Sequence, residues 1–258
     1  MLEWLKGGKA KFTVETASIS ECGPVRKENQ DSWFIDPAGR VYVVSDGMGG
    51  GQGGAIASKM MCERLAVAAD GARDFPDLLR RSSDAIQNAN LKIRQYAAAR
   101  GWRQMGCTLA AIFMEQATGC AIIAHVGDSR VYRVRNGTLE LLTHDHTVAA
   151  EIERQKHPNA STDELARRSS PLAHILTRAV GVHEEIAADW RKIDILAGDT
   201  YLICSDGVHD MVEPRRIRDC LACTPDAREA LANLAIAVIN GGAMDNYTAV
   251  ILKIKEAK

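Results

Sequence analysis

The chain has 258 residues, of which 46% are hydrophobic and 5% aromatic, a composition that supports a folded aliphatic core and excludes a disordered or fibrous protein. The 32 Lys and Arg residues balance 33 Asp and Glu residues, so no basic field is available for binding nucleic acid. The chain start lacks a signal-peptide pattern, and no run is long and apolar enough to span a membrane. The seven scattered cysteines suggest reduced thiols. We therefore expect a soluble cytoplasmic protein.

The first half of the chain combines strand-like runs with two helices. Runs rich in β-branched residues predict strands at 32–35 and 40–45. A glycine-rich loop precedes helical spacing over 55–69, and a second helix is expected over 74–100 with Asp74 as its cap. Further strands are expected at 108–114, 120–126 and 131–134.

The second half contains a polar insertion followed by a return to strands. Between 143 and 181 the helix fragments are polar and are interrupted by Pro158 and Pro171, which indicates an inserted surface subdomain. Strands are expected at 200–204 and 247–254, and a helix at 231–239. Several strands lie too close in sequence for helical crossovers, so antiparallel pairing is favoured. The sequence predicts one mixed α and β domain over 1–258.

Four aspartates follow or precede apolar runs in similar settings. Asp46 and Asp206 each stand in an Asp-Gly pair after such a run, Asp128 follows 121–126, and Asp245 precedes the last strand. Taken alone, each is more typical of a turn. If strand ends bring several together, carboxylates ~4 Å apart repel by about 4 kcal/mol at an effective dielectric near 20, so the cluster must be protonated or bound to cations. Oxygen ligands favour Mg²⁺ or Mn²⁺ over zinc.

Arg26 precedes another carboxylate, Asp31, by five residues. A lone arginine is most often a solvated charge. An arginine fork also suits a phosphate dianion, and arginine combined with metal ions forms a site for a phosphoryl group.

Seven motifs occur in order along the chain. They are Gly-x-x-Arg-x-x-Asn-Gln-Asp (23–31), Val-Val-Ser-Asp-Gly-Met-Gly-Gly (43–50), Gly-Cys-Thr (106–108), Val-Gly-Asp-Ser-Arg-Val-Tyr (126–132), Leu-Thr-Arg-Ala-Val-Gly (176–181), Ser-Asp-Gly-Val-x-Asp (205–210) and Asp-Asn-Tyr-Thr (245–248). In this order they resemble the PP2C family of metal-dependent protein serine/threonine phosphatases in its bacterial form, from about Phe12 to Lys255.

The resemblance implies an α+β fold in which two antiparallel sheets, flanked by helices, form a four-layer αββα sandwich with a flap subdomain over about 145–181. It also implies a monomeric enzyme that hydrolyses phosphoserine and phosphothreonine through a metal-activated water and reverses a cognate bacterial Ser/Thr kinase. By motif, Asp46 would bridge two Mn²⁺ or Mg²⁺ ions, the Gly47 carbonyl would bind one, and Asp206 and Asp245 would bind the other.

The same resemblance assigns three further roles. Asp31 would help to hold the metal-bound water, Asp128 with Asp206 would bind a weaker third ion, and Arg26 would bind the substrate phosphate. Two cations ~3.5 to 4 Å apart can lower the pKa of a bridging water and hold phosphoryl oxygens, so no phosphoenzyme is needed. None of the seven cysteines has Arg six positions later, which disfavours a thiol nucleophile.

Two departures and several alternatives remain open. Met48 follows the first Asp-Gly pair where many eukaryotic members have His, and a thioether cannot donate a proton, so the proton donor to the leaving group is undefined. Cys107 replaces a small hydroxyl residue, which we interpret as a packing variation. A dinucleotide site at 49–54 would leave the aspartate motifs unexplained. A catalytically silent phosphoprotein-binding module is disfavoured because the three main metal-binding aspartates are present, and a phosphatase of anti-sigma-factor antagonists normally carries sensory domains.

The remaining candidates are interpreted mainly as structural. We expect His125 in the core, a helix beginning near 144–146, unremarkable thiols at the helix-end positions Cys220 and Cys223, and an exposed basic turn at 167–170. His209 is the histidine whose position beside Asp206 makes proton transfer worth testing.

Overall fold

Two antiparallel sheets form the centre of the molecule, in a computed structural model that describes residues 12–49, 53–102, 104–156 and 171–257. The first sheet has the order β1 (Phe12–Glu21), β11 (Tyr247–Glu256), β10 (Thr200–Cys204), β7 (Arg130–Arg135) and β8 (Thr138–Leu141). The second has the order β2 (Asp31–Ile35), β3 (Val41–Met48), β5 (Leu109–Glu115), β6 (Cys120–Val126) and β9 (Asp189–Asp194), and β4 (Gly106–Cys107) pairs with β3.

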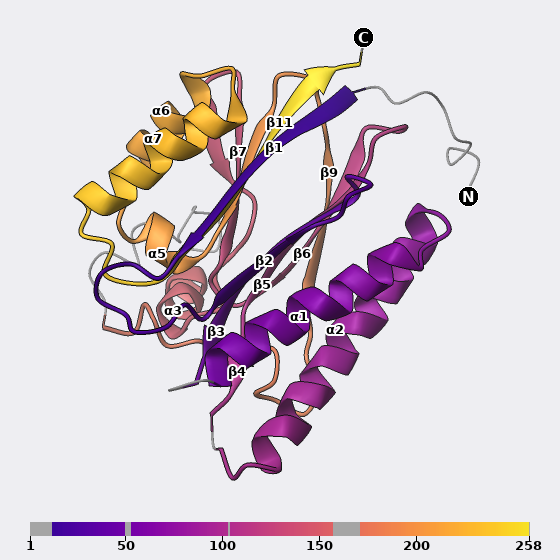
Figure 1. Ribbon diagram of the computed structural model, residues 1–258, viewed down its shortest axis with the longest axis vertical. Coiled ribbons are helices and arrows are strands. Elements are labelled where there is room, and N and C mark those ends of the chain that lie inside the picture. Colours follow the sequence, from indigo (N-terminus) through magenta and orange to yellow (C-terminus); the bar gives the residue numbers. More distant parts are fainter. Residues whose placement is uncertain (1–11, 50–52, 103, 157–170, 258) are drawn as a thin grey trace.

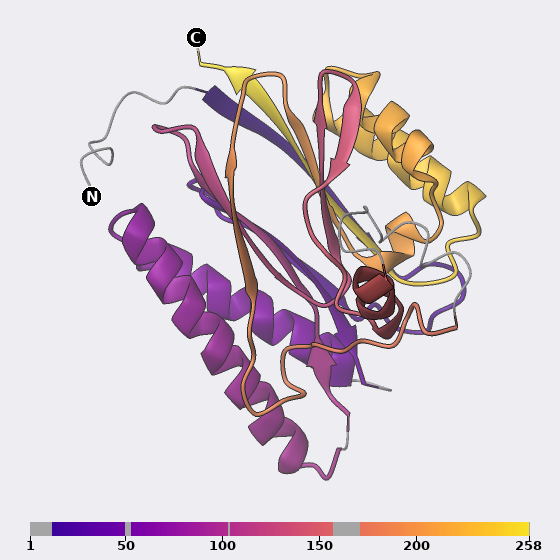
Figure 2. The same ribbon diagram turned by 180° about the vertical axis from the view of Figure 1, so that it is seen from behind.

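Helices cover the outer face of each sheet. The pair α1 (Gly53–Asp70) and α2 (Phe75–Ala98) packs on the second sheet, whereas α6 (Pro214–Ala222) and α7 (Ala227–Asn240) pack on the first (Figures 1 and 2). Two other helices, α3 (Val148–Lys156) and α5 (Asp206–His209), lie in the connections. The predicted αββα sandwich of two antiparallel sheets is confirmed.

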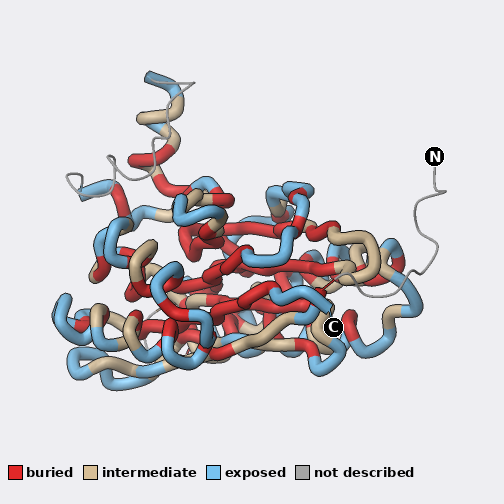
Figure 3. The backbone as a smooth tube through the Cα atoms, turned by 90° about the horizontal axis from the view of Figure 1, so that it is seen from above, coloured by how far each residue is buried: buried red, intermediate tan, exposed pale blue. Residues whose placement is uncertain are grey.

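The central strands are apolar on both faces because they lie between two layers. In β3, Val41 and Val43 pack toward α1 and α2, and the alternate residues Tyr42 and Val44 pack between the sheets. A strand buried on both faces reads as a continuous apolar run, which explains why these strands were recognisable in the sequence. Figure 3 shows the buried residues concentrated through the middle of the molecule.

Element positions agree with the sequence where burial is complete. Strands β6 and β10 have the predicted bounds. Helix α2 has the predicted cap, since the Asp74 side chain accepts a hydrogen bond from the Asp77 N–H at 2.8 Å. Strands β1, β8 and β9 were missed because their side chains are largely exposed or partly buried.

Several local predictions need correction. Asp46 and Gly47 were expected just beyond the end of a strand, but both lie inside β3, which continues to Met48. Helix α3 begins at Val148, after the predicted start at 144–146. The basic turn expected at 167–170 lies outside the described residues.

All seven cysteines are free, and Cys220 and Cys223 lie near the end of α6 as expected. Within the described ranges, no helix has the length and apolar character needed to cross a lipid bilayer.

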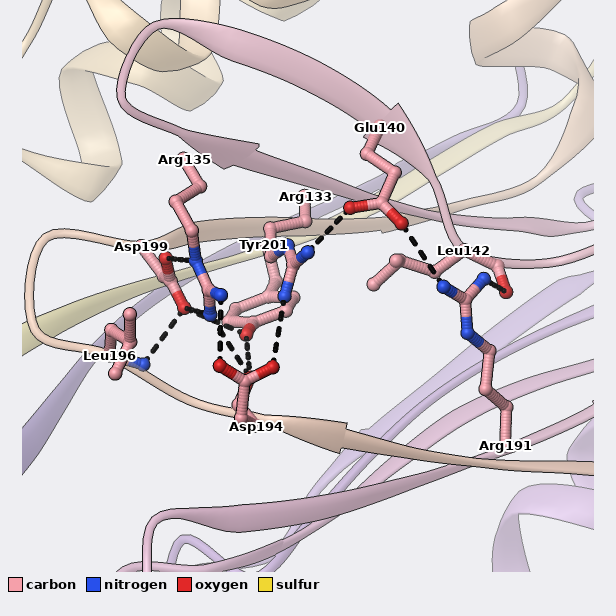
Figure 4. Close-up of polar contacts among 9 residues, drawn as sticks. All are labelled: Arg133, Arg135, Glu140, Leu142, Arg191, Asp194, Leu196, Asp199 and Tyr201. Carbon is pink, nitrogen blue, oxygen red and sulfur yellow. Dashed lines mark hydrogen bonds and ion pairs between the residues drawn. The ribbon is translucent and has the colours of Figure 1, made fainter.

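An ion-pair network ties the two sheets together at the end of β7 (Figure 4). Arg135 bonds both carboxylate oxygens of Asp199 at 2.7 Å and reaches Asp194, the last residue of β9, at 2.9 Å. The Tyr201 hydroxyl also donates to Asp199 at 2.9 Å. Arg133 and Arg191 extend the network through Glu140. Since β7 and β9 belong to different sheets, these charges fix one sheet against the other.

Candidate active site

The predicted aspartates meet where the two sheets converge. Asp31 and Asp46 are directly opposite each other in the β2–β3 pairing. Ser205, which follows β10 in the other sheet, donates its hydroxyl to Asp31 Oδ2 at 2.7 Å and accepts from the Thr248 N–H at 2.9 Å. Hydrogen bonds therefore connect β2 with β10 and β11, so the carboxylates belong to a rigid frame.

A second set of hydrogen bonds positions Asp46 relative to Asp128. The Asp46 N–H donates to Thr108 Oγ1 at 2.9 Å, and that hydroxyl shares a 2.6 Å hydrogen bond with Ser129. Ser129 directly follows Asp128, whose carbonyl lies 3.1 Å from His209 Nε2 in α5. The α5 helix begins at Asp206, so the same contacts also place that carboxylate.

Gly47 allows the backbone to approach the start of α1 closely. A Cβ atom at Gly47 would lie 2.1 Å from the Gly54 carbonyl oxygen, a distance that no side chain tolerates. The Gly47 N–H donates to the Gln30 carbonyl at 3.1 Å, and the residue lines the cleft described below. The glycine is thus required by packing, and its carbonyl oxygen is a further potential metal ligand beside the aspartates.

Repulsion and burial dominate the electrostatics of this cluster. Burial raises the pKa of Asp46 well above its usual value, and the neighbouring carboxylates of Asp31, Asp206 and Asp128 raise it further. Burial raises the pKa of Asp31 to about 6, against the lowering effect of the Ser205 hydrogen bond. Asp31 and Asp46 therefore hold a proton more readily than a solvated carboxylate unless a cation offsets their charge.

The oxygen atoms of the cluster are suitable ligands for hard divalent cations. Asp31 Oδ1 is buried and has no hydrogen-bond donor within the described part of the chain. A buried acceptor without a donor is rare in folded proteins and indicates an ion or water. The ligands available are carboxylate and carbonyl oxygens, which suit Mg²⁺ or Mn²⁺.

Arg26 and Asp245 occupy the outer side of the cluster. Arg26 Nη2 bonds Asp245 Oδ2 at 2.6 Å, and this contact is the main cause that raises the pKa of Arg26. Asn246 holds the loop by donating its side-chain amide to the carbonyls of Cys22 and Glu28. The predicted phosphate ligand thus lies at the cluster and pairs with a predicted metal ligand.

These groups line a cleft of about 1260 Å³. Its lining includes every predicted site residue except Asp31, which is buried beside Asp46. Met48 also lines the cleft, so the position that departs from the eukaryotic pattern faces the site.

The histidines around the cluster differ in burial and contacts. His209 is not a cleft residue: its side chain is 1% exposed and its ring nitrogens contact Asp128 and Asp210, so it has a positioning role. His125 is buried as predicted, and burial lowers its pKa to about 3. His174 was not singled out from the sequence, yet it offers a ligand atom within 4.8 Å of Asp206 and Asp210. No spacing signal marks it, because it lies in the connection between α3 and β9, far in sequence from both aspartates.

Comparisons with known proteins agree with this geometry. The family model described as protein phosphatase 2C matches residues 25–235. The protein phosphatase PhpP of Streptococcus pneumoniae is 31% identical over 250 residues, which cover 94% of this chain and 98% of PhpP.

Solved structures give the same result. The Mycobacterium tuberculosis serine/threonine phosphatase PstP is 31% identical with a TM-score of 0.82, over 94% of this chain and 99% of that one. A PstP catalytic domain bound to two manganese ions is 29% identical with a TM-score of 0.80, over 95% of this chain and 100% of that one. The chain therefore belongs to the protein phosphatase 2C family and is a metal-dependent protein serine/threonine phosphatase.

Proposed function

We propose that Asp46, the Gly47 carbonyl, Asp206 and Asp245 hold two Mn²⁺ or Mg²⁺ ions at which phosphoserine and phosphothreonine are hydrolysed. The observation that carries this assignment is the raised pKa of Asp46 among three other carboxylates, which makes the cluster unfavourable without bound positive charge. When bound, two divalent cations would lower the pKa of a shared water and offset the charge of the phosphoryl oxygens.

The chain's own residues orient the reacting groups. Asp31, whose Oδ1 lacks a hydrogen-bond donor among the described residues, accepts a hydrogen bond from the attacking water. Arg26 is 55% exposed and bonds Asp245 through one nitrogen of its five-donor fork, so other N–H groups can bind the substrate phosphate. The Ser205 and Thr108 hydrogen bonds keep the carboxylates in place without rearrangement.

A third, weaker ion is assigned to Asp128 and Asp206. Both carboxylates raise the pKa of Asp46, which supports their proximity to the main cluster. The flap over about 145–181, within the single domain 1–258, governs the choice of protein substrate, because its polar segments carry none of the proposed ligands.

The physiological setting belongs to the same proposal. We assign the enzyme to the bacterial cytoplasm, where it acts as a monomer on proteins phosphorylated by a cognate Ser/Thr kinase. The seven free cysteines support a reducing compartment. Phosphoproteomics of a deletion strain tests the link to a cognate kinase, and size-exclusion chromatography tests the monomeric state.

Turnover of p-nitrophenyl phosphate and of a phosphothreonine peptide tests the metal assignment. Activity should vanish in EDTA and return with Mn²⁺ or Mg²⁺, since carboxylate and carbonyl sites bind these ions reversibly. Full activity after EDTA treatment and dialysis would contradict the two-ion site.

A further inference from the structure

The cleft extends well beyond the aspartate cluster. Its far wall is built from the end of α2, which carries Arg94, and from the connection that returns to β4, which carries Trp102 and Met105. Val182, from the connection before β9, completes this wall. The cleft volume of about 1260 Å³ exceeds the roughly 300–1,000 Å³ of a typical small-ligand pocket. A phosphoryl group fills only a small part of this space, so a chain segment that carries the phosphate can lie along the remainder.

Arg94 provides an uncompensated positive charge on this wall. The residue is partly buried and lines the cleft, and its side chain forms no ion pair or hydrogen bond with any residue that the structure describes. Other arginines of α2 behave differently, since Arg80 and Arg81 both pair with Asp77. A guanidinium that faces a cleft without an acidic partner is suited to an anion brought by the ligand.

Trp102 provides a firmly held apolar surface beside it. The indole is 37% exposed and packs edge-on against Tyr96, with ring centroids 6.1 Å apart. A Cβ atom at Gly53 would lie 3.4 Å from its ring, so the indole also contacts the first turn of α1. An aromatic side chain fixed on two sides offers contact area at little entropic cost on binding.

The wall is fixed relative to the rest of the cleft. Asn90, one helical turn before Arg94, accepts a hydrogen bond from the Gly181 N–H at 2.7 Å and donates to the His183 carbonyl at 3.0 Å. Gly181 has φ +96° and packs against Ile93, where a Cβ atom would approach to 2.2 Å. These contacts lock the end of α2 to the segment that carries Val182, so Arg94 is presented from a rigid element.

We propose that Arg94 and Trp102 form a subsite that binds the substrate polypeptide next to the phosphorylated residue. Arg94 binds an anionic group, either a carboxylate or a second phosphate, and Trp102 packs against an apolar side chain. The proposal rests on the proposed phosphatase function. The subsite selects phosphoproteins whose phosphosite is flanked by acidic and apolar residues.

Kinetics with matched phosphothreonine peptides test the subsite. Peptides carry Glu, phosphoserine or Gln at each flanking position in turn, and the phosphoserine is introduced as its non-hydrolysable phosphonate analogue because phosphoserine is itself a substrate. p-Nitrophenyl phosphate serves as a substrate without flanking residues. The wild type should prefer Glu or phosphoserine over Gln at one or two positions. Arg94→Gln should raise KM for those peptides about tenfold, the effect of one charge-assisted hydrogen bond, with kcat little changed. The ratio of Glu to phosphoserine rates distinguishes the two anion sources.

Controls separate a binding role from a structural one. Arg94→Lys should restore part of the preference, and Arg64→Gln, an exposed arginine of α1 outside this cleft, should leave it intact. Trp102→Ala should remove discrimination between Leu and Ser at a flanking position, whereas Trp190→Ala, a change at a tryptophan of similar exposure outside this cleft, should retain it.

Two results overturn the subsite. A wild type that hydrolyses every peptide equally well, or an Arg94→Gln variant that slows p-nitrophenyl phosphate and all peptides in the same proportion, contradicts the subsite while the phosphatase function stands. If neither p-nitrophenyl phosphate nor any peptide is hydrolysed with either metal, both proposals are wrong.

Discussion

Strands β7 and β10 carry charge in opposite ways at their two ends. At one end Asp128 and Asp206 face Asp46, and the carboxylates raise the pKa of Asp46. At the other end Asp199 is bonded to Arg135 and Tyr201, and the Arg135 hydrogen bond lowers the pKa of Asp194. The paired end stabilises the folded chain by itself, whereas the clustered end carries repulsion that the proposed cations would offset. Charges and polar groups that lack a compensating partner within the fold are typical of functional sites.

We expect the largest effect from a substitution within the aspartate cluster. Asp46→Asn should lower turnover of a phosphothreonine peptide with Mn²⁺ about a thousandfold, or roughly 4 kcal/mol of transition-state stabilisation, because it weakens the ligand that we propose both ions share. Initial rates measure the change, with circular dichroism as the folding control. A variant with near-normal turnover would place the reaction elsewhere.

The paired end should respond in the reverse manner. Asp199→Ala leaves Arg135 without its bidentate partner and should lower the free energy of unfolding by about 3 kcal/mol. Urea unfolding measures the loss. Turnover at a temperature where the variant is folded should match that of the wild type, because Asp199 does not line the cleft. A fall in turnover without a fall in stability would show that the two ends are coupled.

Arg26 combines features of both ends, because it lies at the aspartate cluster and is paired with Asp245. Arg26→Ala should raise KM for phosphopeptide about tenfold through the lost charge-assisted bonds to phosphate, with a smaller fall in kcat. Steady-state kinetics at saturating Mn²⁺ checks this expectation. An unchanged KM would leave Arg26 only its contact with Asp245.

The smallest effect concerns stability and pH without metal. Asp31 has a folded pKa of about 6, above its ordinary 3.8, so its contribution to stability is present below the ordinary value and is lost as pH rises through 6. In EDTA, the free energy of unfolding of the wild type, measured by urea denaturation, should therefore fall by an amount on the order of 1 kcal/mol between pH 5 and pH 7.5, and Mn²⁺ should reverse the trend.

Asp46→Asn provides the matched control for that measurement. Removing one repelling carboxylate should make the variant in EDTA more stable than the wild type at pH 7.5, with a weaker dependence on pH. A wild type whose stability in EDTA rises over this window would contradict the raised pKa values.

The sequence allowed prediction of those parts that depend on local pattern. Strands buried on both faces, such as β6 and β10, appear as apolar runs, whereas the edge strand β9 exposes most of its side chains and carries no such signal. The aspartates were recognisable by motif. The family resemblance also implied that they share one centre. The direct pairing of Asp31 with Asp46 was not predictable, because it depends on strand register.

Contacts between distant segments were beyond sequence reasoning for the same reason. Arg26 meets Asp245 across 219 positions, and no local pattern indicates that a predicted phosphate ligand also contacts a predicted metal ligand. Arg94 and Trp102 lie in and after a helix whose sequence indicates only amphipathic packing. Their place in the cleft follows from the Asn90–Gly181 contact, which exists only in the folded chain.

The backbone contact between Gly47 and Gly54 has a consequence for mutational tolerance. A Cβ atom at either position would collide with the other's backbone, at 2.1 Å from Gly54 and 2.6 Å from Gly47. In a scan of all single substitutions, these two positions should reject every residue, including alanine, as strongly as the aspartates of the cluster. Loss of function at Gly54 would then report a steric limit, since this glycine has no side chain to contribute to the reaction.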